Sequence, residues 1–215
     1  MARILVTGAG GFIGRALCPD LAARGHRVIA GLRRDSVLAM PPIEGIEPRA
    51  LGEISPNRDW SDALRGVDIV IHLAQQAHRR TAGHILAGEP VAAAGLARAA
   101  AQAGVRRFLY MSSIKAMGNA TSPGRRFCAD DVPHPDDAYG RAKLASELVL
   151  TKIAEESGLE ALGLAIEGAL EEGSGGTVTS AEALPERLRA GARGERTSRL
   201  GGRGVAAFDP VGGPG

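Results

Sequence analysis

The sequence predicts an α/β protein built on a doubly wound parallel sheet. Over residues 1–158, short apolar segments alternate with longer segments of helical periodicity, which is the pattern of a parallel sheet covered by helices. Gly25, Gly66 and Gly104 each lie just after a predicted helix and shortly before an apolar segment. Glycine is preferred there because the residue that caps a helix C-terminus adopts a left-handed conformation. This repeated order of helix, glycine and strand indicates one sheet made of successive βα units.

The elements are assigned in chain order from these segments. We predict strands over residues 3–7, 27–32, 46–51, 68–73 and 106–112, of which 46–51 has the weakest pattern. We predict helices over residues 12–24, 59–65, 86–103 and 136–157. Residues 159–166 form one further strand candidate, which its alanines and glycine weaken.

The composition changes after the last of these segments. From residue 167 onward the chain is rich in Gly, Ala, Arg and Glu, and Phe208 is its single aromatic residue. Residues 182–190 are a helix candidate, and residues 201–215 have the composition of a flexible end. We therefore expect a sheet domain over residues 1–166 and a divergent, poorly ordered tail over residues 167–215.

The composition as a whole limits the classes of partner. The formal net charge of +2 is too small to indicate a nucleic acid or an anionic membrane. Cys18 and Cys128 lack metal-ligand spacing, so we expect buried thiols and no metal site. The N-terminus lacks the pattern of a signal peptide, and no apolar run is long enough to span a bilayer. These observations predict a cytoplasmic protein with no membrane span.

The first predicted strand ends in a glycine-dense turn that leads directly into a helix. Gly8 permits a tight turn, Gly11 lacks a Cβ that would hold a phosphate away, and Gly14 allows the helix and the strand to pack closely. The N–H groups and the dipole at the start of the helix favour a negative charge there. This context predicts a site for a pyrophosphate, and an ordinary glycine-rich turn without a ligand is the alternative.

A second group of candidate residues lies on and before the last predicted helix. Tyr139 and Lys143 are four residues apart and therefore share one face of that helix. A nearby ammonium favours phenolate, so we expect Lys143 to lower the pKa of Tyr139 and to make it a usable general acid or base. Ser112 and Ser113 lie at the end of a predicted strand, at the sheet edge where doubly wound folds bind ligands. Taken alone, the two serines are better interpreted as turn hydroxyls that satisfy the local backbone.

As a set, the glycine turn, the two serines and the Tyr-x-x-x-Lys motif resemble the short-chain dehydrogenase/reductase superfamily. The closer similarity is to its extended branch, the NAD(P)-dependent sugar-nucleotide epimerase/dehydratase family. Residues 7–14 match the signature Thr-Gly-x-x-Gly-Phe-Ile-Gly, residues 68–74 resemble the fourth strand of that family, and residues 108–118 resemble its fifth strand. The resemblance covers residues 2–158 and implies a Rossmann fold.

The resemblance implies a catalytic role for three residues. Tyr139 would exchange a proton with a substrate hydroxyl or carbonyl while a hydride moves to or from the nicotinamide. Lys143 would hold the nicotinamide ribose and keep the pKa of Tyr139 low, and Ser113 would hydrogen-bond the same substrate oxygen. The implied substrate is a small molecule, a nucleotide- or lipid-linked sugar, and the implied reaction is epimerisation, dehydration or reduction. Family members often form homodimers through two helices, which here would be those over residues 86–103 and 136–157.

The resemblance also implies which residues bind NAD or NADP. They are Gly8, Gly11, Phe12, Ile13, Gly14, Leu73, Ala74, Tyr139 and Lys143. Glu53 lies where an acidic residue usually contacts the adenine amino group, and a solvated loop carboxylate is the alternative. Arg33 falls where NAD-dependent relatives place an aspartate, and with Arg34 it suits the 2′-phosphate of NADP. The sequence therefore favours NADP, and Asp35 close by leaves NAD open.

The chain departs from the family pattern in two places. Glu89 stands where the family usually has an asparagine that steadies the active-site lysine through water. After the last predicted strand, the chain lacks the family's usual Arg-Pro-x-x-Val-Tyr-Gly-Pro-Gly-like run and C-terminal part, so we expect a truncated or reading-frame-shifted member. Two alternatives stay open. One is a non-catalytic dinucleotide-binding module or inactive family member, and the other is an NADPH-dependent ketone reductase of the hydroxysteroid or flavonol type.

Overall fold

The computed structural model describes residues 1–33, 37, 40–75, 82–120, 127 and 131–164. The expected tail with its helix candidate, together with Arg34 and Cys128, lies outside the described residues. None of the helices in the described part combines the length and the apolar character that crossing a membrane requires.

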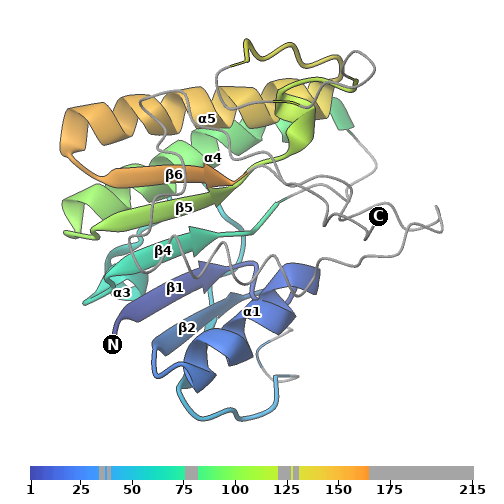
Figure 1. Ribbon diagram of the computed structural model, residues 1–215. Coiled ribbons are helices and arrows are strands. Elements are labelled where there is room, and N and C mark those ends of the chain that lie inside the picture. Colours follow the sequence, from blue (N-terminus) through green and yellow to red (C-terminus); the bar gives the residue numbers. More distant parts are fainter. Residues whose placement is uncertain (34–36, 38–39, 76–81, 121–126, 128–130, 165–215) are drawn as a thin grey trace, which may run out of the picture.

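Six parallel strands form one sheet in the order β3-β2-β1-β4-β5-β6 (Figure 1). The strands are β1 (Arg3–Thr7), β2 (Arg27–Leu32), β3 (Ile46–Ala50), β4 (Ile69–His72), β5 (Arg107–Met111) and β6 (Glu160–Leu164). The strand order reverses between β1 and β4, and doubly wound sheets bind ligands at such a point. The predicted doubly wound α/β fold is thus confirmed.

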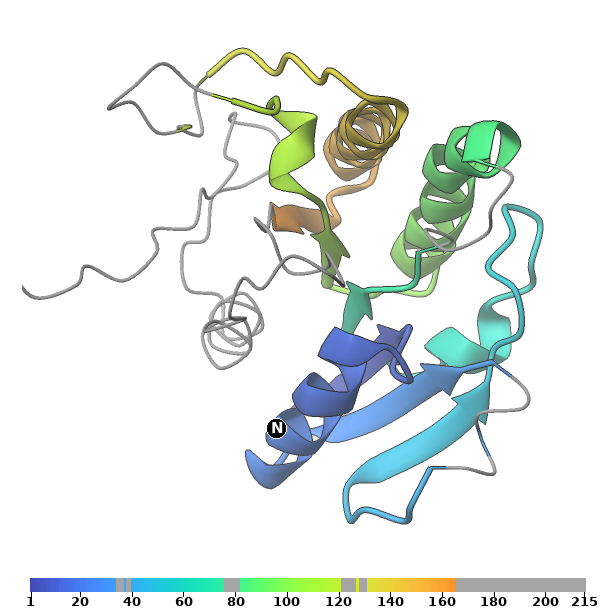
Figure 2. The ribbon, with the colours of Figure 1, turned by 90° about the vertical axis from the view of Figure 1, so that its right-hand side faces the viewer.

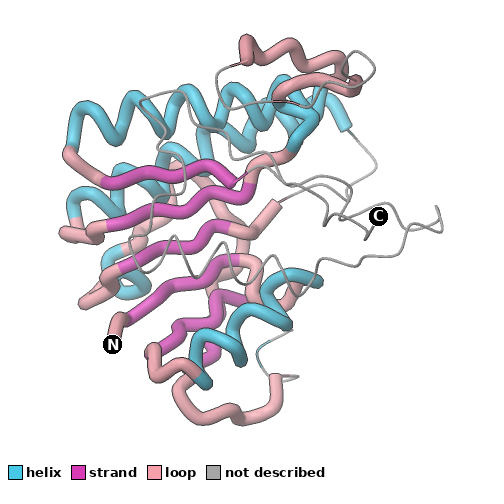
Figure 3. Tube along the Cα trace, viewed as in Figure 1, coloured by secondary structure: helices cyan, strands magenta, loops and turns pink. Residues whose placement is uncertain are grey.

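Helices cover both faces of the sheet (Figures 1 and 2). On one face lies α1 (Phe12–Ala23), and on the other lie α3 (Ser61–Leu64), α4 (Ala82–Gln102) and α5 (Ala138–Ser157). Successive strand residues such as Leu5 and Val6 belong to opposite core layers. Because both sides of each central strand are buried, the strands are apolar throughout rather than alternating. Figure 3 shows this arrangement as helices and strands.

Differences between predicted and observed bounds have local causes. Helix α4 begins at Ala82, one turn before the predicted start at residue 86, and it continues through Gly88 and Pro90. Helix α5 begins at Ala138 instead of residue 136, because the Asp137 carboxylate accepts a hydrogen bond from the Gly140 N–H (2.6 Å) and caps the helix. The weak strand prediction is confirmed as β3, whose Pro48 is tolerated at the sheet edge.

The predicted glycine caps are also confirmed. Gly25, Gly66 and Gly104 have φ angles of 82°, 68° and 76°, which is the left-handed region expected after a helix. These caps lie in the short connections that lead into the amino ends of β2, β4 and β5, whereas the candidate residues lie at the opposite edge, at the carboxyl ends of the strands.

Candidate active site

The glycine turn joins the carboxyl end of β1 to α1 and lies at the point where the strand order reverses. Gly8 has a φ of 72°, and a Cβ there would lie 2.7 Å from the Ala74 nitrogen. A Cβ on Gly14 would lie 2.5 Å from the Cα of Ala9. Gly11 is the exposed N-cap of α1, and among the described residues no side chain forms a capping hydrogen bond there. The turn is therefore closed on its inner side and open at the helix N-terminus.

A buried contact connects this turn to β4, the neighbouring strand in the sheet. The Thr7 hydroxyl and Nδ1 of His72 are 2.6 Å apart, and the Thr7 oxygen also accepts a hydrogen bond from the Ala74 N–H (3.4 Å). Burial, together with the charge of Lys143, lowers the pKa of His72 to about 3. His72 is therefore a neutral imidazole that ties β1 to β4, which suits a structural role.

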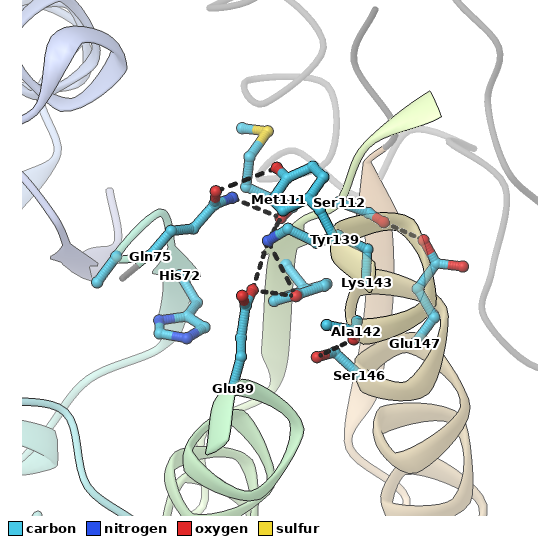
Figure 4. Close-up of polar contacts among 12 residues, drawn as sticks. His72, Gln75, Glu89, Met111, Ser112, Tyr139, Ala142, Lys143, Ser146 and Glu147 are labelled. Atoms are coloured by element: carbon cyan, nitrogen blue, oxygen red, sulfur yellow. Dashed lines mark hydrogen bonds and ion pairs between the residues drawn. The ribbon is translucent and has the colours of Figure 1, made fainter. Parts of the chain in front are cut away.

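Tyr139, on α5, lies between residues that follow β4 and β5 (Figure 4). Its hydroxyl donates a hydrogen bond to Oε1 of Gln75 (3.3 Å), whose Nε2 donates to the Met111 carbonyl (3.2 Å). Hydrogen bonding with Ser113 lowers the pKa of Tyr139. Ser113 itself caps the short 3-10 helix η1 (Ile114–Ala116). The structure therefore brings Tyr139, Ser113 and Gln75 together.

The two neighbouring serines have different surroundings. Ser113 is half-buried beside Tyr139, whereas Ser112 is buried and donates a hydrogen bond to the carboxylate of Glu147 on α5. Burial raises the pKa of Glu147, while the Ser112 hydroxyl and the charge of Lys143 lower it. Ser112 is thus occupied inside the protein, and Ser113 is the serine that faces the phenol.

Lys143 lies on the same face of α5 as Tyr139 and is completely buried. Its ammonium donates hydrogen bonds to Oε1 of Glu89 (2.5 Å), to the Met111 carbonyl (3.0 Å) and to the Tyr110 hydroxyl (3.1 Å). Tyr110 in turn donates to the same Glu89 oxygen (2.7 Å). Glu89 thus brings α4 into the site and forms a closed ring of polar contacts with β5 and α5.

The pKa of Tyr139 differs from the sequence-based expectation. It is raised to about 12, chiefly by burial and then by the charges of Glu89 and Asp137, which together outweigh the lowering by the hydrogen bond with Ser113. The expectation that Lys143 keeps the pKa low is therefore wrong for this arrangement. Nζ of Lys143 lies 5.6 Å from the centre of the Tyr139 ring, and its charge is paired with the carboxylate of Glu89.

The remaining candidate residues lie along the same edge at other strand ends. Leu73 and Ala74 follow β4 and are half-buried, while Arg33 follows β2 and is exposed. Glu53 is exposed in the loop after β3. The strand order puts Arg33 and Glu53 on the β2–β3 side of the glycine turn and Tyr139 on the β5 side. The two groups of candidates are thus separated by the turn itself.

Sequence reasoning missed two contacts in this site. Gln75 was not a candidate, and its only signal was its position shortly after the buried strand β4. Glu89 was noted as a departure from the family pattern, but the sequence did not predict its ion pair with Lys143. Lys143 is one of only three lysines in the chain, which was a signal that this cation has a specific partner.

Comparison with known proteins agrees with this geometry. The model of the NAD dependent epimerase/dehydratase family matches residues 4–204, and so reaches beyond residue 158, where the motif resemblance ends. The chain is 31% identical over 163 residues to the UDP-glucose 4-epimerase of Vibrio cholerae, with 73% of this chain and 48% of that protein covered. It is also 31% identical to the 2-alkyl-3-oxoalkanoate reductase of Stenotrophomonas maltophilia (strain K279a), covering 67% and 44%.

Solved structures show the same fold. The structure of MoeE5 in complex with UDP-glucuronic acid and NAD superposes with a TM-score of 0.64 at 30% identity, covering 76% of this chain and 54% of that one. The chain therefore spans about half the length of the curated relatives and the solved structure that it matches. The matched residues include the glycine turn, the six strands and the Tyr139–Lys143 helix. This chain belongs to the NAD-dependent epimerase/dehydratase family.

Proposed function

We propose that this chain binds NAD or NADP along the carboxyl edge of the sheet and uses Ser113, Tyr139 and Lys143 in a hydride-transfer reaction on a nucleotide- or lipid-linked sugar. The observation that carries the proposal is the position of two sites at one sheet edge. The glycine turn lies at the switch point of the strand order, and the Ser113–Tyr139 pair lies at the end of the strand β5 on the far side of β4.

The glycine turn has the shape that a pyrophosphate needs. The N-terminus of α1 carries no side-chain cap, so its backbone N–H groups and dipole can meet a negative charge. Side chains at Gly8 and Gly14 would collide with backbone, which keeps the turn tight. Arg33 at the end of β2 is exposed and available to a 2′-phosphate, which favours NADP, and NAD stays the alternative.

The dinucleotide, when bound, would supply hydride transfer at its nicotinamide ring. Tyr139 exchanges a proton with the substrate oxygen, and Ser113 donates a hydrogen bond to the same oxygen. Lys143 would hold a ribose hydroxyl of the cofactor after giving up one of its present hydrogen-bond partners. For Tyr139 to act as a base, its pKa must fall from about 12, and a positive charge closer to its oxygen than Lys143 is in this structure would lower it.

The relatives support a sugar nucleotide as the substrate class. The Vibrio cholerae relative is a UDP-glucose 4-epimerase, and MoeE5 was solved with UDP-glucuronic acid and with UDP-glucose. A second candidate function, reduction of a small ketone, is favoured by the similarity to the 2-alkyl-3-oxoalkanoate reductase and to the 3-beta-hydroxysteroid dehydrogenase of Mycolicibacterium neoaurum, which is 31% identical over 126 residues. A non-catalytic dinucleotide-binding module is the remaining alternative.

We also propose that the protein forms a homodimer through the outer surfaces of α4 and α5. These helices pack side by side on one face of the sheet (Figure 1), and each exposes an apolar side chain. Val91 on α4 is 54% exposed, and Leu148 on α5 is 63% exposed. Leu148→Glu is expected to shift the sedimentation coefficient from dimer to monomer; a monomeric parent protein would contradict the proposal.

The catalytic proposal is tested by assaying the purified chain with NADH, NADPH and their oxidised forms against UDP-sugars and against small ketones. Tyr139→Phe is expected to lower turnover by about 10²–10⁴ while saturable cofactor binding persists. Turnover of sugar nucleotides alone supports the epimerase/dehydratase function, and turnover of ketones alone supports the reductase. Cofactor binding without any Tyr139-dependent turnover would identify a non-catalytic module.

A further inference from the structure

The three N–H donors of the Lys143 ammonium are matched by three protein acceptors. Glu89, Met111 and Tyr110 accept them at 2.5, 3.0 and 3.1 Å. Since an ammonium has three donors, Lys143 has none left for another ligand in this arrangement. The Lys143 side chain is fully buried and that of Glu89 is 9% exposed, so water screens this ion pair little.

Glu89 also affects the phenol of Tyr139. Its carboxylate lies on the same side of the site and opposes the ionisation of Tyr139, second only to burial in raising the pKa of that residue. Lys143, which has the opposite charge and would favour phenolate, is already paired with Glu89. One carboxylate therefore acts on both members of the Tyr-x-x-x-Lys motif.

We propose that Glu89 is a positioning residue that restrains the site: it holds Lys143 in a buried ion pair and, through this pair and its own charge, opposes the ionisation of Tyr139. Lys143 must give up Glu89 before it can hold a ribose hydroxyl. This last step rests on the proposed function, whereas the restraint on Tyr139 does not, because it belongs to the protein alone.

Titratable and charged groups face Lys143 from every element packed around it. They are Glu89 from α4, His72 from β4, Tyr110 from β5, and Tyr139 and Glu147 from α5. Burial lowers the pKa of Lys143, and Glu89 and Glu147 raise it. His72 is neutral above its pKa of about 3, so it adds no charge in the alkaline range in which Tyr139 is tested.

The test follows tyrosinate formation directly, which needs neither cofactor nor substrate. The chain contains only two tyrosines, so subtracting the alkaline ultraviolet titration of a Tyr139→Phe variant from that of its parent isolates Tyr139. This difference is measured in the wild-type protein, in Glu89→Gln and in Glu156→Gln. Glu156 lies on the same helix as Tyr139, in an exposed ion pair with Lys152, and serves as the matched control. Circular dichroism at each pH limits the comparison to the folded range.

The wild-type and Glu156→Gln proteins are expected to show no Tyr139 ionisation below about pH 11, whereas Glu89→Gln should lower the pKa of Tyr139 by about one unit or more. Equal pKa values in wild type and Glu89→Gln would overturn the proposal. If Glu89→Gln does not fold, the wild-type titration decides, because ionisation of Tyr139 near its ordinary pKa of about 10 would overturn it as well.

The outcome is independent of the proposed function. A lowered pKa of Tyr139 in Glu89→Gln, in a protein that binds neither NADH nor NADPH, would support the restraint by Glu89 and contradict the proposed cofactor binding. An unchanged pKa in a protein that binds cofactor and turns over substrate would contradict the restraint by Glu89 and support the proposed function.

Discussion

The glycine turn and the Tyr139–Lys143 cluster form the two halves of the candidate site, and they are built by different means. The turn is made of backbone, and its shape depends on side chains that are missing at Gly8 and Gly14. The cluster is made of side chains from three separate elements, and its central ion pair joins Glu89 and Lys143 across 54 residues of sequence. Local sequence therefore determines the first half, whereas only the folded sheet determines the second.

This difference leads to different responses to substitution. A side chain introduced in the turn must displace backbone atoms, so its effect depends on the space around the glycine. Replacing a charged side chain of the cluster by a neutral one leaves the charge of its partner in the interior, so the effect depends on electrostatics.

Lys143→Met should cause the largest loss of stability, because it leaves the Glu89 carboxylate buried without its cation. Breaking a buried ion pair in this way costs about 3–5 kcal/mol of unfolding free energy. Lys152→Met is the control, since Lys152 is 73% exposed and its pair with Glu156 should contribute less than about 1 kcal/mol. Urea denaturation of both variants measures the difference. Similar losses in the two would mean that the cluster is not a buried ionic network.

Gly14→Ala should lower the unfolding free energy by about 1–3 kcal/mol, because the new Cβ would lie 2.5 Å from the backbone of Ala9. The matched control is Gly88→Ala in α4, where a Cβ meets nothing within 4 Å. In a helix this control should be neutral or stabilising by up to about 1 kcal/mol. Thermal unfolding of the pair reads out the contrast, and equal melting temperatures would show that the turn is looser than its glycines indicate.

His72 lies between the two halves and gives the smaller, pH-dependent effect. Its pKa in the folded protein is about 3, and an unfolded histidine titrates near 6.5, so the unfolded chain binds the extra proton between these values. Stability is therefore complete above about pH 6.5 and falls as the pH drops, by about 1.4 kcal/mol per pH unit from this group.

His72→Asn keeps a polar group near Thr7 and removes the titration. Unfolding free energies of both proteins at pH 7, 6 and 5 should converge as the pH falls, because only the wild type loses the His72 contribution. Parallel pH dependences in the two proteins would exclude His72 as the source of the loss of stability at low pH.

These contrasts also explain how much of the molecule the sequence predicts. The order of strands and helices along the chain and the glycine caps follow from patterns that span only a few residues, and the structure confirms them. The proximity of Tyr139 and Lys143 follows from the helical repeat, which is equally local.

The partners of those two residues could not be predicted in the same way. Glu89 reaches Lys143 only because α4 packs beside α5, and Gln75 reaches Tyr139 only because β4 ends next to β5. The same limitation led to the wrong expectation for the pKa of Tyr139, since burial and Glu89 dominate it. The different surroundings of Ser112 and Ser113 likewise depend on the orientation of α5 against the strand end.

The most direct test of the account is a calorimetric titration of the purified full chain with NADH and NADPH, in the wild type and in Gly11→Val. Among the described residues, an added Cβ at Gly11 approaches only the Gly8 carbonyl, at 3.2 Å, so the substitution acts chiefly on the space in front of the α1 N-terminus. We predict saturable binding of at least one dinucleotide to the wild type and to the Gly88→Ala control, and a loss of about tenfold or more in Gly11→Val. Absence of binding to the wild type, or equal affinity in Gly11→Val, would contradict the assignment of the glycine turn as the cofactor site.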